Sequence, residues 1–340
     1  DTDTQQEIKK LIASNPKELT ESFYKDLEFG TGGMRGVMGV GTNRMNKYTI
    51  GKNTQGLSNY LQQSFPNEPL KVAIAYDCRH NSKTFAKIVA DVFSANNIKA
   101  YLFEDLRPTP ELSFAIRHFG CQGGIVITAS HNPKEYNGYK AYWDDGGQLI
   151  SPHDKNVIDE VLKIEDISDV KFNGNDELIE IIGEEVDDIY LKNIHSLSLS
   201  PDAIKRQKDF KIVFTPIHGT GVTLVPKALK MFGFEQVFMV DEQATPDGNF
   251  PTVVSPNPEE SAALALAMQK AQEILNKHNL KRITNQESAE YAYIIINNKK
   301  KKIQACQNRI GSTRRAKCAR AKKICFVLWQ RAKRSRIRNT

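Results

Sequence analysis

The chain has 340 residues, a length typical of about two domains of roughly 150 residues each, and its 40% hydrophobic content is that of a globular protein. It has no run of about 18 apolar residues, and its N-terminus lacks the apolar core of a signal peptide, so we expect a cytoplasmic protein without a membrane partner. The formal charge of +7 is uneven, because residues 276–340 carry 19 Lys and Arg against two acids, whereas residues 1–275 carry 28 basic and 38 acidic side chains.

Strand and helix patterns alternate along the first half of the chain. A short apolar run at 71–76 predicts a strand, and apolar residues at helical spacing in 82–96 predict a helix. The same order recurs as a strand at 99–103, a helix at 111–119 and a strand at 124–128. Repeated strand-helix units predict an α/β fold with a mixed, largely parallel sheet covered by helices.

A second set of strand-helix units follows an acidic segment at 164–200, in which a helix is expected at 184–195. Its strands are predicted at 210–215 and 236–239, with a helix at 223–232 between them and another at 259–273. We therefore predict a first domain over residues 1–200, a partial second domain over 201–273 and a basic tail over 274–340.

The strand at 124–128 leads into Thr128-Ala129-Ser130-His131-Asn132-Pro133. A hydroxyl is thus expected at the carboxyl edge of the sheet, where ligands of open α/β sheets bind. Ser130 could act there as a nucleophile or phosphate carrier, with His131 and Lys140 as nearby groups to manage its proton. Since Ser, Asn and Pro all favour turns, a simple turn is the alternative interpretation.

A glycine-rich segment, Phe29-Gly30-Thr31-Gly32-Gly33-Met34-Arg35-Gly36, precedes the first strand-helix unit. It lacks the G-x-G-x-x-G spacing of dinucleotide sites and has no acid about 20 residues further on, which argues against nicotinamide binding. The segment favours a backbone that approaches a phosphate and holds Arg35 at the site. A glycine-rich hairpin without such a role is the alternative.

Several motifs in the chain occur together in one known family. They are TASHNP at 128–133, YNGYK at 136–140, WDDGGQ at 143–148, FGTGGMRG at 29–36, AYDCR at 75–79, RPTP at 107–110 and TPIHGTG at 215–221. From about Glu21 to about Glu273 the chain resembles the N-terminal half of the α-D-phosphohexomutases, closest to the longer branch of phosphoglucomutase, phosphomannomutase and phosphopentomutase. The resemblance implies an isomerase that interconverts sugar 1-phosphates and 6-phosphates of glucose or mannose through a phosphoserine, with a 1,6-bisphosphate as activator.

The resemblance also assigns roles to individual residues. Ser130 would be the phosphoserine, Lys140 the proton acceptor, and Arg35, His131 and His218 groups that position the substrate or move protons. The substrate would be bound by Thr31, Gly32, Arg35, Asn132 and Lys140. Without the resemblance, His218 is interpreted as a hydrogen-bonded turn residue.

The family holds Mg²⁺ between the serine phosphate and a D-x-D-x-D-R loop, because a hard cation prefers oxygen ligands. No such triplet exists in this sequence, which leaves Ser130 as the only predicted metal ligand. The family's later sugar-selecting and phosphate-binding loops are also missing. We therefore expect a truncated and inactive chain.

The basic tail over 274–340 allows two interpretations. Its Lys and Arg runs, its single glycine and the end of the resemblance near Glu273 favour a segment that is out of frame or disordered. The alternative is a non-catalytic remnant that binds sugar phosphate, or nucleic acid through a genuine tail. We do not expect nucleic acid to be the partner.

Overall fold

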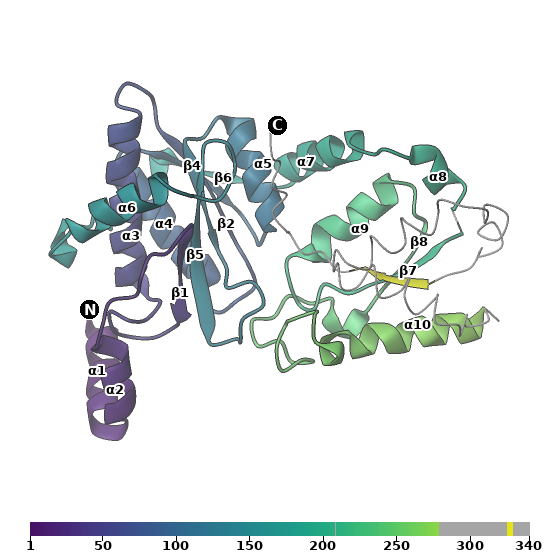
Figure 1. The fold of residues 1–340 in the computed structure, drawn as a ribbon, viewed down its shortest axis with the longest axis horizontal. Coiled ribbons are helices and arrows are strands. Elements are labelled where there is room, and N and C mark those ends of the chain that lie inside the picture. The colour runs from purple at the N-terminus through teal and green to yellow at the C-terminus, as the bar shows by residue number, and fades with distance from the viewer. Residues whose placement is uncertain (208, 279–324, 329–340) are drawn as a thin grey trace. The chain divides into compact units, whose positions relative to one another are not determined.

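The computed structural model describes residues 1–207, 209–278 and 325–328. The chain divides into two compact units, Asp1–Tyr190 and Leu191–Thr340 (Figure 1). The domain boundary near residue 200 stays a prediction. Within the part of the chain that the structure describes, no helix is long and apolar enough to cross a bilayer.

The first unit is built on a six-stranded sheet in the order β1-β5-β4-β2-β3-β6. The strands are β1 (Gly33–Val37), β2 (Lys71–Tyr76), β3 (Lys99–Phe103), β4 (Gly123–Ile127), β5 (Tyr136–Trp143) and β6 (Ile179–Ile182). Strands β4, β2, β3 and β6 are parallel, whereas β5 lies antiparallel to both β1 and β4. This mixed, largely parallel sheet confirms the predicted fold class.

Helices cover both faces of this sheet (Figure 1). They are α3 (Lys47–Ser64), α4 (Ser82–Ala95), α5 (Thr109–Phe119), α6 (His153–Leu162) and α7 (Glu184–Ser196), the last of which crosses the division between the units. Val72 and Ile74 of β2 belong to the core formed with α3, α4 and α6, whereas Ala73 and Ala75 belong to the core formed with α5. Because both faces are buried, β2 is apolar nearly throughout, as expected for a central parallel strand.

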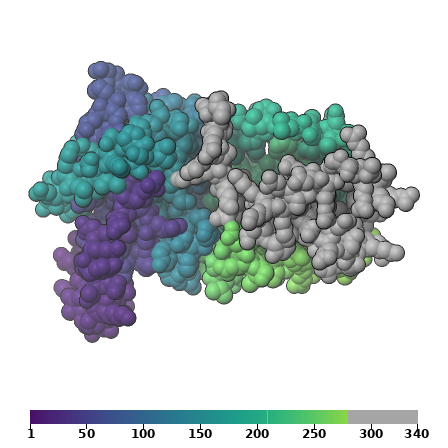
Figure 2. All heavy atoms as spheres, viewed as in Figure 1, coloured from purple at the N-terminus to yellow at the C-terminus, as the bar shows by residue number. Residues whose placement is uncertain are grey.

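Helices α1 (Thr2–Ser14) and α2 (Pro16–Phe23) precede the sheet and project from the first unit (Figure 2). No residue of α1 is buried, and Ser22 is the only buried residue of α2. These two helices therefore add little to the core around the sheet.

The second unit contains a three-stranded parallel sheet in the order β8-β7-β9. Its elements are α8 (Pro201–Lys205), β7 (Lys211–Phe214), α9 (Gly221–Met231), β8 (Gln236–Met239), α10 (Ala265–Lys277) and β9 (Cys325–Leu328). Ala267, Ala271 and Ile274 of α10 pack with Val213 of β7 in the core. Of the predicted basic tail, only 274–278 and the backbone of β9 are described. Its other residues lie outside the described residues, so its interpretation stays a prediction.

The predicted elements agree closely with those of the structure. The strands expected at 71–76, 99–103 and 236–239 have the observed bounds, and the helices expected at 82–96, 111–119, 184–195 and 223–232 end within two residues of the observed ones. The helix predicted at 259–273 is replaced by a 3-10 turn at Ser261–Leu264 followed by α10. The antiparallel strands β1 and β5 and the parallel edge strand β6 were not predicted.

Gly33 lies where β1 comes close to β5, and its lack of a side chain allows this approach. It has φ +133°, and a Cβ atom added to it would lie 2.0 Å from the carbonyl oxygen of Tyr139. We expect Gly33→Ala to lower the free energy of unfolding by about 3 kcal/mol or more, because backbone strain adds to a backbone clash. Gly120→Ala is the control, since Gly120 also has a positive φ but meets only the Lys71 Nζ atom at 3.7 Å. It should cost about 1–2 kcal/mol. Equal losses in urea denaturation would contradict this account.

Candidate active site

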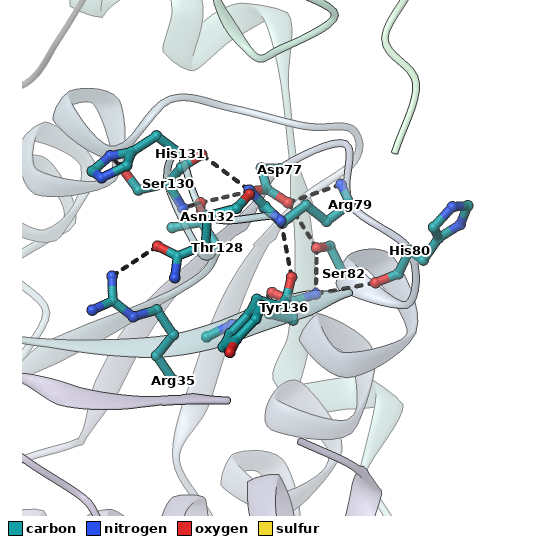
Figure 3. Close-up of polar contacts among 12 residues, drawn as sticks. Arg35, Asp77, Arg79, His80, Ser82, Thr128, Ser130, His131, Asn132 and Tyr136 are labelled. Carbon is teal, nitrogen blue, oxygen red and sulfur yellow. Dashed lines mark hydrogen bonds and ion pairs between the residues drawn. The ribbon is translucent and has the colours of Figure 1, made fainter. Parts of the chain in front are cut away.

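Ser130 lies in the connection between β4 and β5, here called the serine loop (residues 128–135), at the carboxyl edge of the sheet (Figure 3). The serine is exposed and has φ +62°. A left-handed backbone costs a residue with a side chain about 1–2 kcal/mol, so the surrounding contacts must stabilise it.

One of these contacts is a chain of hydrogen bonds beneath Ser130. The Ser130 amide donates to Thr128 Oγ1 at 3.0 Å, and that hydroxyl donates to Asp77 Oδ2 at 2.6 Å. Asp77 Oδ1 accepts from the Arg79 amide at 2.9 Å and from Ser82 Oγ at 2.8 Å. Asp77 therefore joins the end of β2 and the start of α4 to the serine loop.

Arg79 makes a second set of contacts with the serine loop and the start of β5. Its Nη1 donates to the carbonyl oxygens of Pro133 and Tyr136 at 2.8 and 2.9 Å, and its Nη2 donates to those of Asn132 and Ser130 at 2.6 and 3.2 Å. The Arg79 side chain is 0% exposed, and its Nε lies 3.5 Å from Asp77 Oδ2. Burial lowers the pKa of the Arg79 guanidinium, which the negative charge of Asp77 opposes. The buried group stays cationic.

Two predicted site residues reach Ser130 or its neighbours directly. Arg35, exposed on β1, donates from Nη1 to Asn132 Oδ1 at 3.1 Å. His131 Nδ1 lies 3.4 Å from Ser130 Oγ, a long contact for a hydrogen bond. The structure thus brings Ser130, His131, Asn132 and Arg35 together at one edge of the sheet (Figure 3).

The other predicted residues of the first unit lie where β1 meets β5. Lys140 is half-buried on β5 and faces Gly33 across the pair of strands. The carbonyl oxygen of Gly32 accepts from the Ala141 amide at 3.1 Å and from Gln148 Nε2 at 2.8 Å. Thr31 is exposed beside it. Since Gly30 and Gly33 exchange two backbone hydrogen bonds, the glycine-rich segment is a tight turn held against β5.

His218 belongs to the second unit and is 2% exposed. Its Nδ1 lies 2.8 Å from the carbonyl oxygen of Thr245, and its Nε2 lies 2.9 Å from Thr252 Oγ1. A carbonyl oxygen can only accept, so Nδ1 carries a proton. Gln243 Nε2 also donates to Thr252 Oγ1, at 3.0 Å. Both ring nitrogens are therefore used inside the unit, as the turn interpretation of His218 expects.

Among the residues that the structure describes, no group of three or more His, Cys, Asp or Glu could hold a metal ion. Asp77 is the carboxylate in the network beneath Ser130, and both of its oxygens already accept hydrogen bonds. Mg²⁺ requires near-octahedral coordination by oxygen. The described residues therefore do not fit this cation, and Ser130 remains the single predicted ligand.

The network is formed by Asp77, Arg79 and Thr128, none of which has a role predicted from the sequence. The sequence does hold a signal for two of them, because Asp77 directly follows the strand predicted at 71–76 and Arg79 comes two residues later. Polar residues that follow neighbouring parallel strands meet at the same edge of a sheet. The four carbonyl contacts of Arg79 have no sequence signal, because every residue has a carbonyl group.

Comparisons with known proteins identify the family of the chain. Residues 26–168 match the family model described as phosphoglucomutase/phosphomannomutase, alpha/beta/alpha domain I, and residues 188–282 match that of domain II. The chain belongs to the phosphoglucomutase/phosphomannomutase family.

Two relatives are about 40% identical to the chain over the part that aligns. The phosphoglucomutase of Staphylococcus haemolyticus is 40% identical over 258 residues, which cover 75% of this chain and 46% of the relative. The human phosphopentomutase is 39% identical over 269 residues, covering 76% and 44%. The chain thus spans about half the length of the curated relatives it matches.

A solved structure shows the same fold. A putative phosphomannomutase from Thermus thermophilus superposes with a TM-score of 0.62 at 23% identity, over 73% of this chain and 52% of that one. At this identity the likeness supports the arrangement of elements and not the details of the site.

His218→Ala separates a structural role from a catalytic one. The substitution removes the partner of the Thr245 carbonyl and one partner of Thr252, so we expect the free energy of unfolding of the second unit to fall by about 2 kcal/mol. Phosphate uptake by Ser130, the predicted phosphoserine, should be unchanged. Urea denaturation and intact-mass analysis measure the two effects. A stable variant that no longer takes up phosphate would instead make His218 catalytic.

Proposed function

We propose that Ser130 carries a phosphoryl group and that the chain supplies the serine-bearing part of a sugar-phosphate mutase, an isomerase. The observation that carries this proposal is the exposed Ser130, whose left-handed backbone is stabilised by a buried network at the carboxyl edge of the sheet. Strained backbone conformations of this kind cluster at active sites and ligand-binding sites.

The proposed reaction moves one phosphoryl group in each step. The bond between phosphorus and Ser130 Oγ breaks, a bond from phosphorus to a sugar hydroxyl oxygen forms, and the hydroxyl proton passes to a base. We assign this base to Lys140 on β5. In this first step His131, beside Ser130 Oγ, gives the serine oxygen its proton. In the second step the other phosphate of the sugar bisphosphate moves to Ser130 Oγ, the serine proton returns to His131, and the sugar oxygen that loses this phosphate takes the proton from Lys140.

Positive charge stabilises the oxygens of a moving phosphoryl group. Arg35 fits this role, because it is exposed beside Asn132 in the serine loop. Thr31, Gly32, Asn132 and Lys140 complete the proposed binding surface in the first unit. His218 is left out of the proposed chemistry, since both of its ring nitrogens are already hydrogen-bonded.

The proposed substrates are sugar monophosphates, with glucose or mannose 1- and 6-phosphates as first choices and a 1,6-bisphosphate as activator. The names of the relatives, phosphoglucomutase, phosphopentomutase and probable phosphoribomutase, support this class without selecting one sugar. The alternative of a binding remnant with a nucleic-acid tail depends on residues outside the described part.

Phosphate on Ser130 is the direct test of the proposal. Incubation of the chain with glucose 1,6-bisphosphate should give a phosphoryl adduct in intact-mass analysis, and Ser130→Ala should abolish it because the accepting hydroxyl is gone. Ser14→Ala, which removes an exposed hydroxyl on α1, serves as the control and should keep the adduct. An adduct that persists in Ser130→Ala would reject the assignment.

We expect the chain to take up phosphate but not to complete catalytic turnover. The purified 340-residue chain should convert no measurable glucose 1-phosphate. Unlike a single transfer to Ser130, turnover needs the sugar bisphosphate to turn and be held for a second transfer, and the sequence lacks the family's sugar-selecting and phosphate-binding loops, while its described residues hold no group of acids for Mg²⁺. A coupled assay for glucose 6-phosphate with and without Mg²⁺ tests this expectation. Mg²⁺-dependent conversion by the purified chain would show that the ligands are supplied in another way.

A further inference from the structure

Asp77 and Arg79 have no part in the chemistry proposed above, although they make most of the contacts beneath Ser130. Arg79 is 3% exposed, and its side chain is 0% exposed. A buried guanidinium cannot bind the phosphate of a substrate at the edge of the sheet. Any effect of Arg79 on Ser130 must therefore act through its hydrogen bonds to the protein backbone.

Arg79 contacts the backbone of the serine loop at three residues and the first residue of β5. Four carbonyl oxygens, from Ser130 to Tyr136, accept from its two terminal nitrogens at 2.6 to 3.2 Å. The planar guanidinium presents its donors in a fixed geometry, which the single ammonium group of lysine lacks. The loop backbone is therefore fixed at several points by one side chain (Figure 3).

Asp77 acts on Ser130 through Thr128. The carboxylate accepts from Thr128 Oγ1 at 2.6 Å, and Thr128 Oγ1 in turn accepts a hydrogen bond from the Ser130 amide at 3.0 Å. The amide of Ser130 and its carbonyl oxygen, which accepts from Arg79, are thus both hydrogen-bonded to this network. Fixing both groups fixes the backbone conformation of the serine, and with it the place from which the hydroxyl is presented.

We propose that Asp77 and Arg79 are positioning residues that hold Ser130 in its left-handed conformation for phosphoryl transfer, without touching the sugar phosphate. This inference rests on the proposed function of Ser130. Loss of these contacts should slow the transfer step and leave the binding of the phosphate donor unchanged, because no donor-binding group is removed.

The test compares Arg79→Met with the matched control Arg44→Met in the 340-residue chain. Arg44 is also buried, and it donates to Glu18 Oε1 and to the carbonyl oxygens of Glu21 and Asn43, none of which belongs to the serine loop. Hydrogen exchange of residues 128–137 reports the order of the loop. The rate of phosphate uptake from glucose 1,6-bisphosphate, measured over a range of donor concentrations, separates transfer from binding.

Arg79→Met should raise amide exchange in residues 128–137 by about tenfold. It should also lower the saturated rate of phosphate uptake by about 100-fold at an unchanged half-saturating concentration, as a displacement of the reacting group by about 1 Å does. Arg44→Met should change neither quantity, even if it lowers the thermal stability as much.

Unchanged exchange and an unchanged rate in a folded Arg79→Met variant would overturn the inference, as would an equal effect of Arg44→Met. If Arg79→Met does not fold, Thr128→Val decides, because it keeps the side-chain volume and removes only the hydroxyl between Asp77 and Ser130. A wild-type chain without phosphate uptake would reject the proposed function, while loop exchange in the variants would still decide whether Asp77 and Arg79 hold Ser130.

Discussion

The buried guanidinium of Arg79 is the constraint on which the arrangement of the serine loop depends. A charge removed from water costs several kcal/mol unless it is paired and hydrogen-bonded. Asp77 supplies the opposite charge, the serine loop supplies three carbonyl oxygens, and Tyr136 at the start of β5 supplies a fourth. Because these oxygens must point inward to the guanidinium, the loop has few conformations in which the cation is satisfied.

The order of the strands brings together Asp77 and Thr128, the other part of this network. In the parallel pair of β2 and β4, Tyr76 lies opposite Ile127, so the next residues along each strand, Asp77 and Thr128, also come opposite each other. The Asp77 amide continues the ladder by donating to the Ile127 carbonyl at 3.1 Å. A short hydrogen bond between the two side chains follows from this register. The acid thus reaches Ser130 through one hydroxyl, although it lies about 50 residues earlier in the chain.

Sequence patterns predicted the parallel core well because both of its signals are local. Apolar runs such as 71–76 and helical spacing such as 82–96 need no knowledge of distant residues. Strand β5 was not predicted, since Tyr136–Trp143 mixes glycine, asparagine and lysine with aromatic residues and has no clear alternation. Ser130, Arg35 and Asn132 were predicted through their motifs, and the structure brings them together at one edge of the sheet (Figure 3). The role of Arg79 was not predicted, because its partners are backbone carbonyls, and the burial of His218 depends on partners up to 34 residues away.

Strand β5 has a mechanical consequence for the loop that it follows. The ladder between β4 and β5 extends to the hydrogen bond from the Thr128 amide to the Gly138 carbonyl, and buried Asn137 donates to the His80 carbonyl and to Ser82 Oγ at the start of α4. Both ends of the serine loop are thus anchored in the same sheet, unlike a lid that is joined to the protein by a flexible hinge. Ser130 is therefore held in a fixed position. In the proposed mutase reaction, the sugar bisphosphate and not the serine would therefore have to turn between the two transfers.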